Sequence, residues 1–311
     1  MARTLHIVCP ADMTDRLKNE VSALDGVISL QLQRGSSIKP VGDRLSVMVS
    51  NKHLPELMRL LDRFALEKAA DLSINSSEPD SVVASGSTYQ IDRDSNEATW
   101  EEMEMIISND SNATTSTLLL MGIAGSLSVV GIVTNALHIV IGGMLIAPGF
   151  MPIIRIPLGL VSRHRRWYRG AIDTLKCYAA LIAGAAATSL VLRAMDLNVM
   201  DGSPSYYQTS QPLLEYWTTI TGPGLLASGV ASLAGAILIA TKRSIFTSGV
   251  MMGLALVPSA AIIGMAFTTA EWAVAGRASQ RFGLDVILVL LLPMLYFLWE
   301  RIRIHRRDMR L

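Results

Sequence analysis

The residues best suited to bind a solute lie in a stretch that would otherwise form an ordinary membrane helix. Residues 141–160 read IGGMLIAPGFMPIIRIPLGL, an apolar run that holds three prolines and an arginine, Arg155. Proline removes an amide donor and clashes with the preceding turn, so the helix must break or kink here. Broken backbone is tolerated at membrane depth only where protein or a water-filled cavity surrounds it. The sequence therefore predicts a solute pathway at this break.

Arg155 gives this predicted site its charge preference. An arginine in an apolar span is costly unless it faces a cavity, pairs with another group or reaches the interface. A helix that begins again after Pro152 would also direct amide groups and the positive end of its dipole toward the cavity. No Asp or Glu is expected deep in a span, which favours an anionic or strongly polar solute. The alternatives are that Arg155 extends to the cytoplasmic interface beside SRHRRWYR, and that Pro152 and Pro157 are simple kinks.

A second segment resembles the first. A shift of 110 residues aligns IGGMLIAP with VMMGLALVP, so that Gly143 falls on Gly253 and Pro148 on Pro258. These segments are the second and fifth of six expected spans, so a repeat of three spans would place its second copy upside down, as in many secondary transporters. Asn135, in the turn before the first segment, either caps that turn or lines the pathway. The pathway candidates are Asn135, Gly142, Gly143, Pro148, Gly149, Pro152, Arg155, Gly253, Pro258 and Ser259.

The composition indicates a membrane protein with two unlike halves. Half of the 311 residues are hydrophobic. Residues 1–110 hold 11 Lys and Arg against 18 Asp and Glu, whereas residues 111–311 hold 16 against 8. A bilayer-crossing helix needs about 20 apolar residues. The transmembrane domain, residues 114–299, contains six such segments, expected at 114–134, 137–161, 171–193, 218–240, 245–268 and 283–299.

The basic residues predict the orientation of these spans. SRHRRWYRG, TKR and the basic tail at residues 300–311 follow the second, fourth and sixth spans, whereas the loop from 196 to 216 has no Lys or Arg. Lys and Arg concentrate on the cytoplasmic side, so both termini are expected in the cytoplasm. The N-terminus shows no signal-peptide pattern.

The first 76 residues are expected to form a soluble α+β domain. Short β-prone runs alternate with helical ones in the order βαββαβ, the ferredoxin-like plan. Such a domain packs or pairs with its own copy, which predicts a homo-oligomer, or it binds a small ligand. Residues 77–113 are expected to be a linker followed by an amphipathic helix around EATWEEMEMII that packs on the soluble domain. The small residues AGAAATS at 183–189 predict close helix packing, either within the subunit or between subunits.

Other kinds of chemistry have little support. Cys9 and Cys177 lack metal-type spacing, and the histidines are scattered. Nucleophile, paired-carboxylate and phosphate-loop motifs are missing, so neither an enzyme, a metal nor a cofactor is expected. Basic residues cluster at span ends rather than on a soluble face, which disfavours nucleic acid.

Together GIVTNALHIVIGGMLIAPGFMPIIRIPLGLV, SRHRRWYRGA and GVMMGLALVPSAAIIGMAF resemble the bacterial and archaeal family known as the uncharacterised hydrophobic domain. The resemblance covers about residues 3–300 and implies a fold in the cytoplasmic (inner) membrane, not an activity. Family members usually carry a second proline where Ser259 stands, and Arg155 is atypical for them.

Two functions follow as expectations. The first is a transporter or channel that moves a small polar, anionic solute through the lipid bilayer, with the soluble domain as a regulatory or oligomerisation module. The second is a membrane-embedded sensor or scaffold whose soluble domain binds a ligand or partner.

Overall fold

The computed structural model describes residues 2–68, 72–77, 98–163, 167–194, 211–243 and 247–305. The chain divides into two compact units, one of residues 1–99 with 304–311 and one of residues 100–303. Most of the linker predicted after residue 76, part of SRHRRWYRG and the second half of the basic tail lie outside the described residues.

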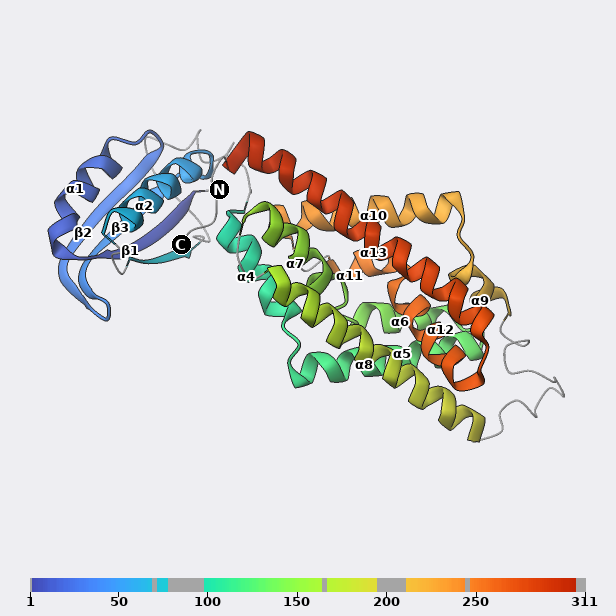
Figure 1. The fold of residues 1–311 in the computed structure, drawn as a ribbon. Coiled ribbons are helices and arrows are strands. Elements are labelled where there is room, and N and C mark those ends of the chain that lie inside the picture. The colour runs from blue at the N-terminus through green and yellow to red at the C-terminus, as the bar shows by residue number, and fades with distance from the viewer. Residues whose placement is uncertain are drawn as a thin grey trace. The chain divides into compact units, whose positions relative to one another are not determined.

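The first unit is a small antiparallel sheet with two helices (Figure 1). The sheet order is β2-β3-β1-β4, and all three strand pairings are antiparallel. This gives the order βαββαβ, which the alternation of β-prone and helical runs predicted. The elements are β1 (Arg3–Cys9), α1 (Ala11–Ser22), β2 (Val27–Ile38), β3 (Val41–Val49), a 3₁₀ turn η1 (Asn51–His53), α2 (Leu54–Lys68) and β4 (Ser73–Ser77).

One face of this sheet forms the core of the first unit. Leu5, Ile7 and Cys9 alternate along β1 and are fully buried, because successive side chains of a strand point to opposite faces. They pack with apolar residues of α1 and α2, including Leu17, Leu61 and others. On the opposite face, His6 Nδ1 and Ser46 Oγ are hydrogen-bonded at 2.9 Å.

The second unit consists of helices. They are α4 (Trp100–Ser111), α5 (Thr115–Val133), α6 (Leu137–Ile146), α7 (Phe150–Val161), α8 (Trp167–Ala194), α9 (Gln211–Thr218), α10 (Gly222–Ala240), α11 (Thr247–Gly253), α12 (Leu256–Thr269) and α13 (Trp272–Glu300), followed by a π-helical turn, η4 (Arg301–His305). Figure 1 shows α13 running along the unit, with α10 beside it.

Several of these helices are long and apolar enough to cross a membrane. Among the described residues there are four, namely α5, α8, α10 and the α13 segment, or five if α6 and α7, bent by 46° at their break, form one span. Six spans were predicted, but α11 with 7 residues and α12 with 14 are each shorter than the roughly 20 residues that a membrane span needs. Both predicted interruptions are present, at residues 147–149 and 254–255.

Three expectations about individual helices were wrong. α7 begins at Phe150 rather than after Pro152. α13 begins at Trp272, far ahead of the predicted span at 283–299, so Asp285 lies well inside a helix and is fully buried. The amphipathic helix α4 belongs to the second unit, where it packs on α7. Trp100 at its start is buried and makes an edge-to-face contact with Phe297 of α13, with 6.5 Å between ring centroids.

Glycines bring α5 and α8 into direct backbone contact. A Cβ at Gly184 would overlap the backbone of Gly122, and one at Gly125 would overlap the carbonyl of Leu181. Ser126 Oγ joins the two helices by donating to Gly122 O at 3.1 Å and Gly184 O at 3.3 Å. The small residues at 183–189 therefore contribute to packing within the subunit.

Candidate functional site

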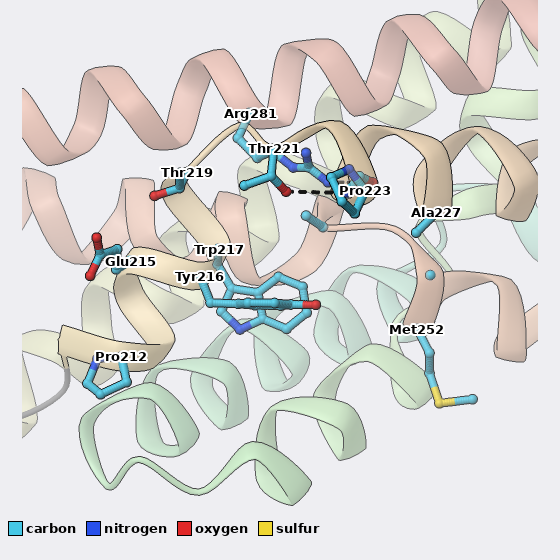
Figure 2. A pocket seen from close by; sticks show the side chains of 13 residues that line it. Pro212, Glu215, Tyr216, Trp217, Thr219, Thr221, Pro223, Ala227, Met252 and Arg281 are labelled. Atoms are coloured by element: carbon cyan, nitrogen blue, oxygen red, sulfur yellow. Dashed lines mark hydrogen bonds between the residues drawn. The ribbon is translucent and has the colours of Figure 1, made fainter.

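A cavity of about 510 Å³ lies in the second unit, where the second helix break meets α9, α10 and α13 (Figure 2). Its volume is in the range of small-molecule sites. Its wall combines aromatic, small and polar side chains, with Arg281 as its cation. The residues lining it are Pro212, Glu215, Tyr216, Trp217, Thr219, Thr221, Pro223, Gly224, Ala227, Met252, Gly253, Ala255 and Arg281.

The local sequence explains how the α10 side of this wall forms. Thr221 is the N-cap of α10, and its hydroxyl accepts a hydrogen bond from the Gly224 amide at 3.2 Å. Pro223 follows in the first turn, where its missing amide proton costs nothing. Gly224 leaves room for Arg281, because a Cβ there would lie 3.3 Å from its Nη1.

Arg281 is anchored through one nitrogen only. Nη2 donates to Gly224 O at 3.2 Å and to Ser228 Oγ at 3.1 Å. The Arg281 side chain is only 6% exposed, and its Nη1 is buried without a hydrogen-bond partner among the described residues. An unsatisfied buried donor costs about 1–3 kcal/mol, and more when the group is charged. The guanidinium is thus held in place through Nη2, while Nη1 keeps unused hydrogen-bonding capacity next to the cavity.

Asp285, one turn further along α13, joins this arginine to the helix break. Its Oδ1 lies 3.5 Å from Arg281 Nη2, and its Oδ2 accepts a hydrogen bond from the Ala255 amide at 2.9 Å. Ala255 occupies the N-cap position of α12, where no side chain of its own caps the helix. A carboxylate is favourable at a helix N-terminus, so Asp285 supplies the missing cap from another helix.

Trp217 places a second unsatisfied donor in the cavity wall. Its side chain is buried, and Nε1 has no hydrogen-bond partner in the described part of the chain. The indole packs edge to face against Tyr216, with ring centroids 4.7 Å apart (Figure 2). Its main-chain carbonyl accepts a hydrogen bond from Ser259 Oγ at 3.2 Å, which joins α9 to the first turn of α12.

The predicted pathway residues of the second broken segment lie at or beside this cavity. Gly253 lines it, and Pro258 and Ser259 are buried in the first turn of α12. Sequence reasoning missed Arg281 and Asp285 because the sixth span was placed too late. Their signal was the Arg–Asp pair at i, i+4, together with apolar Val274, Ala275 and Ala278 at helical spacing upstream.

Arg155 lies in α7, apart from the residues that line the cavity, and its charge is already balanced. Nη2 and Nε contact Glu104 Oε1 at 2.9 and 3.1 Å, and Nη1 lies 3.7 Å from Asp173 Oδ2. Nη1 also donates to Ser111 Oγ at 3.3 Å and Asn112 Oδ1 at 3.2 Å. This arginine therefore fastens α4 and α8 to α7.

The other predicted residues of the first broken segment are placed around its interruption. Asn135 has a φ of 51°, a left-handed conformation that asparagine tolerates well, and it ends the turn after α5. Gly149 O accepts from the Tyr178 hydroxyl at 3.3 Å. Gly143 packs against α5, whereas a Cβ at Gly142 would meet nothing within 4 Å. Pro148 is half-buried in the break, and Pro152 is buried in the first turn of α7.

The described part of the chain contains no cluster of side chains that could serve as metal ligands. Within those residues, no group of three or more His, Cys, Asp or Glu side chains is arranged to hold a metal ion. The chemistry that the cavity offers is hydrogen-bond donation from Arg281 and Trp217 to a bound acceptor.

These features define a helical bundle able to cross a membrane several times, with a cavity lined in part by a buried arginine. Residues 144–291, just under half of the chain, match the model of a family described as "Domain of unknown function (DUF389)". This match runs from the end of α6 into α13 and so includes both helix breaks and nearly all of the cavity's helices. No curated protein and no solved structure matches the chain.

Proposed function

We propose that the protein is a transporter or channel that moves a small anion across a membrane, and that the anion binds Arg281 in the cavity. The observation that carries this proposal is Arg281 Nη1, a buried cationic donor without a hydrogen-bond partner among the described residues, in the wall of a cavity. A buried polar group of this kind calls for an acceptor that the chain does not supply. An anion is the acceptor that a guanidinium binds most strongly.

The position of the cavity supports transport over simple binding. Gly253 and Ala255 bring an interrupted helix into its wall, and interrupted helices form the substrate sites of many secondary transporters. Glu215, the carboxylate in the wall, is exposed and is turned away from Arg281 (Figure 2). Glu215 therefore does not neutralise the guanidinium.

We further infer that the second unit is an inverted repeat of three spans, with α6–α7 and α11–α12 as broken spans. Four features recur at an offset of 107 residues, not the 110 of the sequence alignment, so Pro148 corresponds to Ala255 and not to Pro258. The N-cap Thr114 matches Thr221, and the C-cap Thr134 matches Thr241. The left-handed residues Asn135 and Arg163 match Lys242 and Ala270, with φ of 51°, 58°, 58° and 58°.

The third helices of the two halves support the same repeat. At the same offset Tyr178 corresponds to Asp285, and each side chain bonds to the helix break of its own half, at Gly149 O and at the Ala255 amide. Such agreement at equivalent backbone positions favours duplication over a chance match of Gly and Pro. An odd number of spans in each half would invert one half relative to the other.

The first unit fits a regulatory or oligomerisation role. Its βαββαβ order and β2-β3-β1-β4 sheet are those of a ferredoxin-like module, which leaves one sheet face free of helices. The apolar helices and the basic runs favour a bacterial or archaeal cytoplasmic membrane with both termini inside.

A ligand-stabilisation experiment on the purified full-length protein tests the proposal. Sodium nitrate, chloride, sulfate and acetate would be compared for their effect on thermal unfolding in detergent. An anion at about 100 times its Kd should stabilise the protein by about 2.7 kcal/mol. Arg281→Gln should abolish this effect. Arg277→Gln is the matched control, because Arg277 is exposed one turn earlier on the same helix and does not line the cavity.

Arg281→Lys extends the test, since it keeps the charge but removes the planar fork that presents Nη1. It should retain the fold and weaken anion binding. A stabilising anion would then be followed in liposome flux with the same variants. If no anion stabilises the wild type, or if the effect survives in Arg281→Gln, the cavity is not an anion site.

A further inference from the structure

Arg281 and Asp285 form a buried pair of opposite charges. An anion that binds Arg281 would leave this pair with excess negative charge. Arg281 Nη2 lies 3.5 Å from Asp285 Oδ1, and both side chains are almost wholly buried. Charge at membrane depth is tolerated when it is compensated, and here each residue compensates the other. An anion on Nη1 of the same guanidinium would make the site carry two negative charges for one positive charge.

We propose that Asp285 takes up a proton when an anion binds Arg281, so that the cavity loads an anion and a proton together. This inference rests on the proposed function and states that anion binding is coupled to proton binding. The carboxylate Asp285 plus one proton from water in the cavity becomes a neutral carboxyl group. The site then holds one cation and one anion, as it did before binding, and no uncompensated charge is left buried.

The geometry leaves room for this proton on one particular oxygen. Asp285 Oδ2 already accepts the hydrogen bond from the Ala255 amide, whereas Oδ1 is buried with no hydrogen-bond partner among the described residues. Protonation at Oδ1 preserves the cap on α12 and weakens the attraction of the carboxylate to Arg281 and to the Ser228 hydroxyl. The guanidinium keeps its hydrogen bonds to Gly224 O and Ser228 Oγ, and its positive charge can then be compensated by the bound anion.

The surrounding elements offer few competing sites for the proton. α10 and α12, which both pack on α13, contain no charged residue. α9 contributes Glu215, which is exposed, and α7 contributes Arg155, which is paired with Glu104 and Asp173. From α8, the Tyr178 hydroxyl donates to Gly149 O, and its ring packs against Phe282.

On α13 itself the other ionisable groups lie elsewhere. Arg277 is exposed, and Tyr296 and Glu300 lie near the C-terminal end of the helix. Asp285 is thus the buried carboxylate next to the cavity's arginine within the described residues.

Proton uptake can be measured directly on the full-length protein. Sodium nitrate, whose anion does not titrate near neutral pH, would be added to protein in weakly buffered detergent solution with a pH-indicator dye. Saturating nitrate should cause uptake of about one proton per bound anion. In the pH range where Asp285 is charged in the free protein, the affinity for nitrate should weaken about tenfold for each unit by which the pH is raised. Chloride and sulfate serve as further non-titrating probes.

Asp285→Asn supplies the variant test, because asparagine imitates the protonated acid and can still accept from Ala255. It should bind nitrate with a pH-independent affinity and take up no proton. Glu271→Gln is the control, since Glu271 lies at the N-cap of α13, makes no side-chain cap and does not line the cavity. It should keep the proton uptake of the wild type.

The outcomes separate the coupling from the proposed function. Nitrate binding without proton uptake in the wild type overturns the coupling and leaves the anion site intact, as does uptake that persists in Asp285→Asn. Failure of nitrate, chloride and sulfate alike to bind overturns the proposed function and the coupling with it. Should Asp285→Asn fail to fold, the wild-type measurement decides by itself.

Discussion

Arg155 on α7 and Glu104 on α4 form a largely buried ion pair, with 2.9 Å between Nη2 and Oε1. The two residues are far apart in the sequence, and the pair fastens an amphipathic helix to the broken span. Asp173 of α8, at 3.7 Å from Nη1, completes the neutralisation. The pair therefore belongs to the architecture of the second unit, and it assigns Arg155 a different role from Arg281.

Replacement of Arg155 by alanine should lower the free energy of unfolding without affecting anion binding. Arg155→Ala leaves two carboxylates without their cation, and breaking a buried pair in this way typically costs about 3–5 kcal/mol. Thermal unfolding in detergent would measure the loss, with Arg169→Ala, an exposed arginine of α8, as the control. Nitrate should still stabilise Arg155→Ala by the wild-type amount. A variant of normal stability that no longer responds to nitrate would instead make Arg155 the binding residue.

Two glycines with opposite surroundings test the α5–α8 contact. A methyl group at position 184 would overlap the backbone of Gly122, so Gly184→Ala should destabilise the protein by about 1–3 kcal/mol. Gly142→Ala is the matched variant, because a Cβ there meets nothing within 4 Å. It should be neutral or slightly stabilising, since alanine favours a helix over glycine by about 0.5–1 kcal/mol. Equal effects of the two substitutions would contradict the close contact.

The first unit should lose stability in acid because of Asp43. The Gly35 amide donates to Asp43 Oδ1 at 2.7 Å, and this hydrogen bond, with a second from Thr14, lowers the pKa of the carboxyl below its ordinary 3.8. A lowered folded-state pKa gives stability that is present above the unfolded value and is lost as the pH falls through the folded value.

Hydrogen exchange of β2 and β3, corrected for the intrinsic rate, would report this loss between pH 5 and strongly acidic pH. Asp43→Asn should have a shallower acid dependence than the wild type. Asp15→Asn, which removes an exposed carboxylate of α1, should leave the dependence nearly unchanged. An unaltered acid profile in Asp43→Asn would show that another group dominates.

Cys9 should resist alkylation in the folded protein. Burial raises the pKa of its thiol, and nearby Asp43 and Asp12 act in the same direction, against the hydrogen bond with Thr14. Only the thiolate reacts, so each unit of increase lowers the reactive fraction about tenfold, and the side chain is also inaccessible. Iodoacetamide labelling at pH 8, read by mass spectrometry of the Cys9 peptide, should be at least about tenfold slower than after SDS denaturation. Comparable rates in the two states would mean that the β1 core opens readily.

The sequence predicted those features that depend on local patterns. β-prone runs such as RTLHIVC indicated the strands of the first unit, and the helical spacing of Leu57, Leu60, Leu61 and Phe64 indicated α2. Pro and Gly located both helix interruptions to within a few residues, because their backbone restrictions act on adjacent positions.

Features that depend on contacts between distant elements could not be predicted. The partner of Arg155 lies on α4, which the pattern of acidic residues placed on the soluble domain instead. The cavity exists only because α9, α10 and the break before α12 meet, and no single segment carries that information. Polar residues in the first half of α13 hid its true start, and with it Asp285, the carboxylate that the sequence reasoning considered absent.

The glycine contacts between α5 and α8 have a mechanical consequence. Helices that touch through their backbones have no layer of side chains between them that could repack, so they resist sliding. Any change in the shape of the second unit should therefore carry α5 and α8 along as one rigid body. The movement is expected instead at contacts such as α10 with α13, where the polar side chains of Ser228, Arg281 and Asp285 join the helices and can exchange partners.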